Sequence, residues 1–178
     1  MTLAPLPPSE TVLALRRAFD AAFASPPAPS HAVSERLLAI GLGGDPFAMR
    51  LKDVAGLFKD RRVRLLPASL PHFLGVASLQ GRPVPVYDLR RVFGYNPTPN
   101  PRWLVLVPGP VPLGLAFDSF EGQFAALPEH LVAEPGGRAG HVKQAVRTGE
   151  TLRRIVEVAS VVETVGSQAG AVGPAKEH

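Results

Sequence analysis

The chain contains no cysteine, and it lacks any apolar run of the roughly 18 residues that a bilayer-spanning helix requires. The missing thiols exclude disulfides, thiolate zinc sites, iron–sulfur clusters and cysteine nucleophiles. The first residues, MTLAPLPPSE, have neither the basic start nor the apolar stretch of a signal peptide. These absences predict a cytoplasmic protein that does not insert into a membrane.

Patterns that carry catalysis are missing as well. Residues 41–46, Gly-Leu-Gly-Gly-Asp-Pro, lack the third glycine and the following helix of a dinucleotide loop, so a hairpin turn explains them better. The chain has neither a Gly-x-x-x-x-Gly-Lys phosphate loop nor a Gly-x-Ser-x-Gly nucleophile elbow. No histidine has a second histidine four residues away, as a helical metal site would need. We therefore expect a binding module, with no enzymatic activity, no metal and no cofactor.

The charge balance is basic, with a formal net charge of +4, and most of the cations are arginine. The densest patch is residues 59–64, Lys-Asp-Arg-Arg-Val-Arg. Surfaces that bind nucleic acids usually interleave such patches with exposed aromatic residues or glycine-rich loops, whereas apolar segments separate them here. A nucleic-acid binder that contacts phosphates through Arg61, Arg62 and Arg64 is thus the weaker alternative to a protein partner.

Three regions can be distinguished along the 178 residues. Residues 9–24 repeat apolar side chains at helical spacing and predict an amphipathic helix, which either packs on its own domain or contacts a partner. A proline-rich linker follows at residues 25–30. Residues 34–165 hold short apolar runs cut by turn signals, which predict strands, with a short helical turn at 52–58 and another helix at 89–93 capped by Asp88. Residues 166–178 are small and polar and predict a flexible tail.

The β region has two halves with similar endings. Gly81 is followed after six residues by Asp88-Leu-x-x-Val, and Gly149 after seven residues by Glu157-Val-x-x-Val. Such a repeat favours a mainly β chain of two small barrels on one plan, the first at about residues 36–94 and the second at about 102–165.

Residues 70–94, LPHFLGVASLQGRPVPVYDLRRVFG, carry the most specific pattern. They resemble the signature of the CheW-like chemotaxis coupling family, approximately Phe-x-x-Gly-Val-x-Asn-Leu-Arg-Gly-x-x-x-Pro-Val-x-Asp-Leu. Residues 37–58 resemble the opening hairpin and short helix of that family, and residues 111–131 resemble its second hairpin. The positions that match the signature are Gly75, Val76, Leu79, Gly81, Pro85, Val86, Asp88 and Leu89.

The resemblance implies two five-stranded, SH3-like barrels and no catalysis. Such proteins bridge the cytoplasmic helices of methyl-accepting chemoreceptors to the regulatory domain of a CheA-type histidine kinase, and they join other CheW-like domains in array rings. Carried over by position, the receptor-binding groove would comprise Val54, Leu57, Gln80, Arg82, Phe120 and Gln123. Contacts to the kinase would involve Gly56, Arg61 and Arg62. For Val54 and Leu57, packing in the core is an equally good interpretation.

Two departures from the family pattern bear on the partners. Gln80 stands where the family usually has arginine, which removes a cation able to pair with a receptor carboxylate in bidentate fashion. Gly56 stands where the family often has an acid. These changes leave open an accessory coupling protein that binds receptor but not kinase and tunes the composition of the array.

Overall fold

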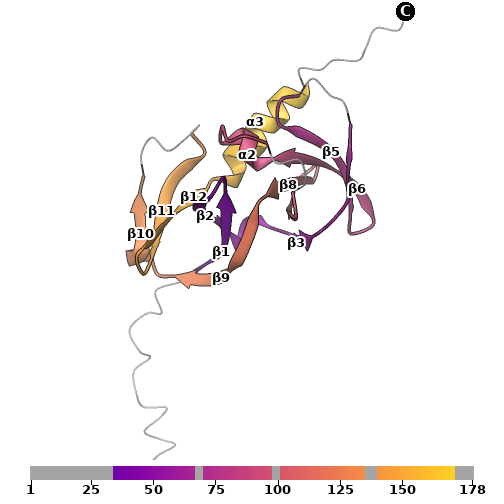
Figure 1. The fold of residues 1–178 in the computed structure, drawn as a ribbon. Coiled ribbons are helices and arrows are strands. Elements are labelled where there is room, and N and C mark those ends of the chain that lie inside the picture. The colour runs from indigo at the N-terminus through magenta and orange to yellow at the C-terminus, as the bar shows by residue number, and fades with distance from the viewer. Residues whose placement is uncertain (1–33, 67–69, 98–100, 135–139, 171–178) are drawn as a thin grey trace, which may run out of the picture. The chain divides into compact units, whose positions relative to one another are not determined.

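The computed structural model describes residues 34–66, 70–97, 101–134 and 140–170. These residues form two six-stranded sheets with short helices (Figure 1), so the prediction of a mainly β chain is confirmed. The predicted helix at 9–24 and the linker at 25–30 lie outside the described residues.

The first sheet has the strand order β10-β11-β12-β2-β1-β9. Its strands are β1 (Glu35–Leu42), β2 (Asp45–Arg50), β9 (Ser119–Ala126), β10 (Leu131–Ala133), β11 (Val142–Thr148) and β12 (Thr151–Val156). The second sheet has the order β3-β7-β8-β6-β5-β4. Its strands are β3 (Gly56–Lys59), β4 (Val63–Leu65), β5 (Phe73–Leu79), β6 (Arg82–Asp88), β7 (Trp103–Val107) and β8 (Leu113–Phe117). The helices are η1 (Leu51–Asp53), α2 (Leu89–Val92), η2 (Pro128–His130) and α3 (Val158–Gly170).

The two halves of the chain exchange their first hairpins. The β1–β2 hairpin pairs with β9 and, in parallel, with β12 of the second half. The β7–β8 hairpin pairs with β3 and, in parallel, with β6 of the first half. The prediction of contiguous barrels at 36–94 and 102–165 is therefore wrong, because each sheet takes a hairpin from the other half. The predicted repeat is nevertheless visible, since both halves follow the same order of strands.

Burial explains why these two hairpins occupy the middle of the sheets. Strand β8 is buried along its whole length, and β1 is buried from Leu37 onward. Leu37 packs into a small cluster within the first sheet, while its neighbour Leu38 packs into the large cluster that both sheets share. A strand with two buried faces needs cover on both sides. Each exchanged hairpin obtains that cover because one of its faces packs on the shared core and the other packs on a smaller apolar cluster within the sheet that it joins.

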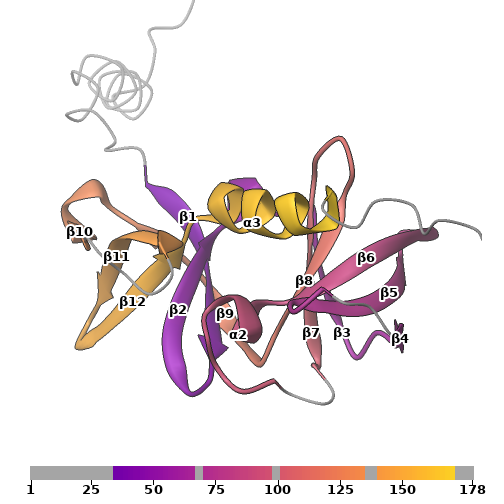
Figure 2. The same cartoon turned by 90° about the horizontal axis from the view of Figure 1, so that it is seen from above.

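The shared core joins the two sheets and the two α-helices, α2 and α3. It includes Phe47 and Met49 of the first sheet together with Leu115 and Phe117 of the second, and all four are almost fully buried. Helix α3 lies between the two sheets in both views (Figures 1 and 2) and contributes Val158, Val161 and Val165 to this core.

The similar endings of the two halves have matching geometry. The Asp88 N–H donates to the His72 carbonyl, and the Glu157 N–H donates to the His141 carbonyl, both at 2.8 Å. Asp88 also caps α2, because its Oδ1 accepts a hydrogen bond from the Arg90 N–H at 3.0 Å. The predicted cap is confirmed.

Two local predictions differ from the structure. The chain at 52–58 is not one helical turn, because η1 ends at Asp53, Val54 is extended and Gly56 begins β3. Pairing of β3 with β7 overrides the weak helical pattern. The tail predicted from residue 166 is wrong as far as Gly170, since α3 continues to that residue.

Ion pairs link the exchanged hairpins to residues at the N-termini of α2 and α3. Arg50, at the end of β2, donates to Glu157 before α3 (2.6 Å), to Glu35 (3.0 Å) and to Gln144 (2.5 Å). In the other half the polarity is reversed, because Asp118 after β8 accepts a hydrogen bond from Arg90 of α2 at 3.1 Å. Both pairs link residues that are far apart in the sequence.

Replacing Arg50 should destabilise the fold. Arg50 is 9% exposed, and Arg50→Met would leave Glu35 and Glu157 without this cation. We expect the free energy of unfolding to fall by about 3 kcal/mol in chemical denaturation. Lys52→Met removes a cation that also pairs with Glu35 but whose side chain is 69% exposed, and it should cost less than about 1 kcal/mol. Equal losses in the two variants would contradict this assignment.

Stability should also fall in mildly acidic solution. Burial lowers the pKa of His141 and of His72 below the usual 6.5. As the pH drops through about 6.5, the unfolded chain binds protons that the folded chain resists, so unfolding becomes easier. Asp53 and Asp88 have the opposite effect on stability at lower pH. Because burial raises the pKa of each carboxyl, the folded chain takes up these protons before the unfolded chain does, and protonation favours the folded state.

Denaturation curves from about pH 7.5 to about pH 5.5 will show this loss, and it should be smaller in His141→Gln. Parallel losses in the native chain and in this variant would exclude His141 as a source of the pH dependence.

Candidate functional site

Four half-buried apolar side chains near the predicted groove are considered together and called the apolar stripe: Val54 after η1, Leu57 of β3, Trp103 of β7 and Phe120 of β9. All four pack against the shared core, and the rings of Trp103 and Phe120 lie 5.2 Å apart. Half-exposed apolar groups of this kind are typical of the anchors at protein interfaces. Three of the four were predicted for the receptor-binding groove, and Trp103 was not.

The register of β3 and β7 places Leu57 and Trp103 of the stripe on one face of the second sheet. Leu57 is opposite Val105, and Lys59 is opposite Trp103. Residues two apart in a strand share a face. Lys59 therefore lies beside the stripe, with its Nζ 5.4 Å from the centre of the Trp103 ring.

A bulge in β9 brings Gln123 to the same side as Phe120. Phe120 is opposite Ile40 and Gln123 is opposite Leu38, two residues of β1 that both face the shared core. The extra residue in β9 is accommodated near Gly122, whose φ of 136° suits glycine. Gln123 is exposed, so it provides a polar edge to the stripe.

Gln80 lies near the face of β3 that is opposite to Leu57. Gln80 and Gly81 form the turn between β5 and β6, with φ values of 51° and 76°. A Cβ added to Gly56 would lie 3.6 Å from Gln80 Nε2 and 3.0 Å from the Phe58 ring. Gly56 and Phe58 share a face of β3, and Leu57 points to the opposite face. The structure thus groups Gln80 with Gly56, away from Leu57, and Arg82 is exposed at the start of β6.

Arg61 and Arg62 follow β3 in the connection to β4. Both are exposed, and the Arg61 guanidinium lies 5.8 Å from the centre of the Phe58 ring. The residues predicted for kinase contact, Gly56, Arg61 and Arg62, therefore lie on and beyond the Phe58 face of β3.

The family model of the CheW-like domain matches residues 36–166, nearly three quarters of the chain. The chain belongs to the CheW-like domain family. Members of this family are scaffold and adaptor domains of chemotaxis signal transduction.

A solved structure supports the same fold for this CheW-like domain. The scaffolding protein TtCheW from Thermoanaerobacter tengcongensis superposes with a TM-score of 0.63 at 18% sequence identity. The match covers 70% of this chain and 89% of that chain. Comparison with curated protein sequences gives no match.

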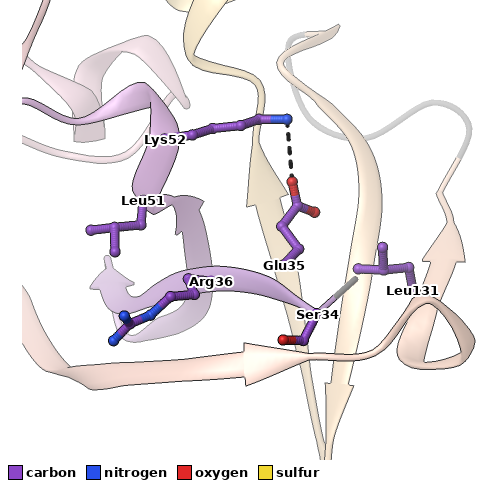
Figure 3. A pocket seen from close by; sticks show the side chains of 6 residues that line it. All are labelled: Ser34, Glu35, Arg36, Leu51, Lys52 and Leu131. Carbon is purple, nitrogen blue, oxygen red and sulfur yellow. Dashed lines mark ion pairs between the residues drawn. The ribbon is translucent and has the colours of Figure 1, made fainter. Parts of the chain in front are cut away.

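A concavity of about 590 Å³ adjoins η1 at the edge of the CheW-like domain (Figure 3). Leu51 and Leu131 line it, and Lys52 Nζ lies 3.4 Å from Glu35 Oε1. Leu51 also packs against the shared core that carries the stripe. This is a shallow apolar hollow crossed by an ion pair.

No group of three or more histidine and carboxylate side chains within the described residues could hold a metal ion. Across the same part of the chain, no helix is long and apolar enough to cross a membrane. The buried His141 has a structural partner, since its Nδ1 lies 2.8 Å from Ser160 Oγ.

Trp103 is the only tryptophan in the chain, so its emission reports on the stripe. Phe120→Ala would remove the ring that covers it, shift the emission to longer wavelength and cost about 2 kcal/mol of stability. Phe73→Ala is a matched control, since Phe73 is also half-buried but pairs with Tyr87 at 5.6 Å. An unchanged emission spectrum in Phe120→Ala would contradict the contact.

Proposed function

We propose that this CheW-like protein is a non-enzymatic adaptor that couples the cytoplasmic helices of chemoreceptors to a CheA-type histidine kinase. The observation that carries the proposal is the apolar stripe, half-exposed on a domain of a scaffold family. The proposal places the protein in the cytoplasm, where those receptor helices end, and among other CheW-like domains in array rings.

The receptor helix would lie along the stripe. An amphipathic helix presents apolar side chains at positions i, i+3, i+4 and i+7, and it gains affinity by burying them against apolar anchors. Val54, Leu57 and Phe120 would be the anchors, together with Trp103. Gln123 and Lys59 would meet polar groups at the margin of the helix, where contacts set register more than affinity. Gln80 and Arg82 would contact the receptor only if it also reaches the Gly56 side of β3.

The kinase would contact the face that carries Gly56, Arg61 and Arg62. Arg61 and Arg62 are exposed, and no carboxylate of the described residues lies within ion-pair distance of either. They can therefore pair with acids of a partner. Loss of the charges usual in this family at positions 56 and 80 favours a second candidate, an accessory adaptor that binds the receptor and leaves the kinase unbound.

Val54→Asp tests the stripe. A buried carboxylate in the interface should weaken binding to a chemoreceptor cytoplasmic tip by roughly 30-fold, about 2 kcal/mol, in a calorimetric titration. Ala55→Asp adds the same charge at the next, exposed residue and should leave the affinity nearly unchanged. Thermal unfolding of both variants shows whether Val54→Asp still folds, and Phe120→Ala provides a second anchor variant without a new charge.

Equal affinity in Val54→Asp and Ala55→Asp would remove the stripe from the receptor interface. A parallel titration with the regulatory domain of the kinase separates the two candidates. Binding to both partners supports the coupling adaptor, and binding to the receptor alone supports the accessory protein. Binding to neither contradicts both.

A further inference from the structure

Strand β4 is a sheet edge with unusual exposure. It ends the order of the second sheet and pairs on one side only, with β5, through Val63↔Ala77, Arg64↔Val76 and Leu65↔Gly75. No other strand within the described residues pairs with its outer side. Leu65 is 65% exposed and Leu66 that follows is 43% exposed. Exposed edges carrying apolar side chains readily add another strand, and proteins usually protect them.

Arginines surround this edge. Arg62 and Val63 line two hollows, of about 380 Å³ and about 600 Å³, next to β4. The first also contains Arg61, Leu65 and Arg102, and the second contains Arg64 and Ser78. Within a few residues, the edge therefore combines backbone N–H and C=O groups that no described strand pairs with, exposed leucine side chains and positive charge.

The single carboxylate lining these hollows is already paired. Asp60 lies 3.1 Å from Arg102, and that hydrogen bond lowers the pKa of Asp60. Asp60 thus offsets Arg102, while Arg61, Arg62 and Arg64 have no carboxylate within ion-pair distance among the described side chains. The excess positive charge is electrostatically complementary to an acidic partner.

We propose that β4 binds an extended, acidic segment of a partner protein, which adds to the sheet as a further strand. The main chain of the segment would pair with the outer edge of β4. Its apolar residues would contact Leu65 and Leu66, and its carboxylates would pair with Arg61, Arg62 and Arg64. The inference deepens the kinase-facing part of the proposed function, on which it rests, since it assigns a chemistry to what Arg61 and Arg62 bind.

Peptide probes test each component on the full chain. The first is a fluorescent nonapeptide of alternating valine and glutamate. The second replaces glutamate by lysine, and the third keeps the first sequence but is N-methylated at alternate amides. We expect the first to bind and to shift the amide NMR signals of residues 63–66. The other two should bind at least tenfold more weakly, because one reverses the charge and the other blocks strand pairing.

Paired variants locate the site. Arg62→Glu with Arg64→Glu should weaken the first peptide at least tenfold, whereas Arg36→Glu with Arg147→Glu makes the same charge change at exposed positions of the other sheet and should have little effect. Leu65→Ser should weaken binding, and Leu152→Ser, at a residue 47% exposed on β12, should not.

Several results would overturn the inference. Equal binding of the N-methylated peptide would exclude strand addition, and equal losses in the two arginine pairs would exclude β4. Tighter binding of duplex DNA than of the acidic peptide, lost in Arg62→Glu with Arg64→Glu, would assign the arginines to phosphate instead. Because the probes contain no kinase sequence, failure here is separate from failure of the kinase titration.

Discussion

The fold depends on one apolar core that both halves of the chain must complete together. Each half gives its first hairpin to the sheet of the other, so Phe47 and Met49 meet Leu115 and Phe117 across the middle of the domain. Neither half could bury both faces of its own hairpin alone. This reciprocal burial is non-local, and it makes the two sheets one cooperative unit in which loss of either half exposes the core of the other.

The apolar stripe is where this shared core reaches the surface. Val54, Leu57, Trp103 and Phe120 pack inward on the same cluster and remain partly exposed outward. Packing in the core and contact with a partner are therefore compatible for Val54 and Leu57. The inner side of each residue packs on the core, and its exposed side is accessible to a partner. Anchors held by a packed core are also preorganised, which reduces the entropy that a partner must overcome on binding.

Some arginines form ion pairs that stabilise the fold, and others are exposed at the surface. Arg50 and Arg90 are paired across the exchanged hairpins with opposite polarity, Arg50 to Glu157 and Arg90 to Asp118. Around β4 the arginines exceed the acids, because Asp60 serves Arg102 alone in the ion pairs of that region. Exposed arginines without a carboxylate within ion-pair distance among the described residues therefore gather around β4, at one edge of the second sheet.

The sequence by itself determined the mainly β class, the turns, the cap at Asp88 and the repeat of the two halves, because these follow from local spacing and residue type. Val54, Leu57 and Phe120 were named only through the resemblance to the family. Tertiary structure decided which sheet each hairpin joins, since the continuous apolar runs of β1 and β7–β8 show double-sided burial but not the partner. It also made Val54 extended and set Leu57 in a strand by pairing with β7. The register and the pleat of β3 and β7 place Trp103 in the stripe and Gln80 beside Gly56. No local sequence pattern specifies this register.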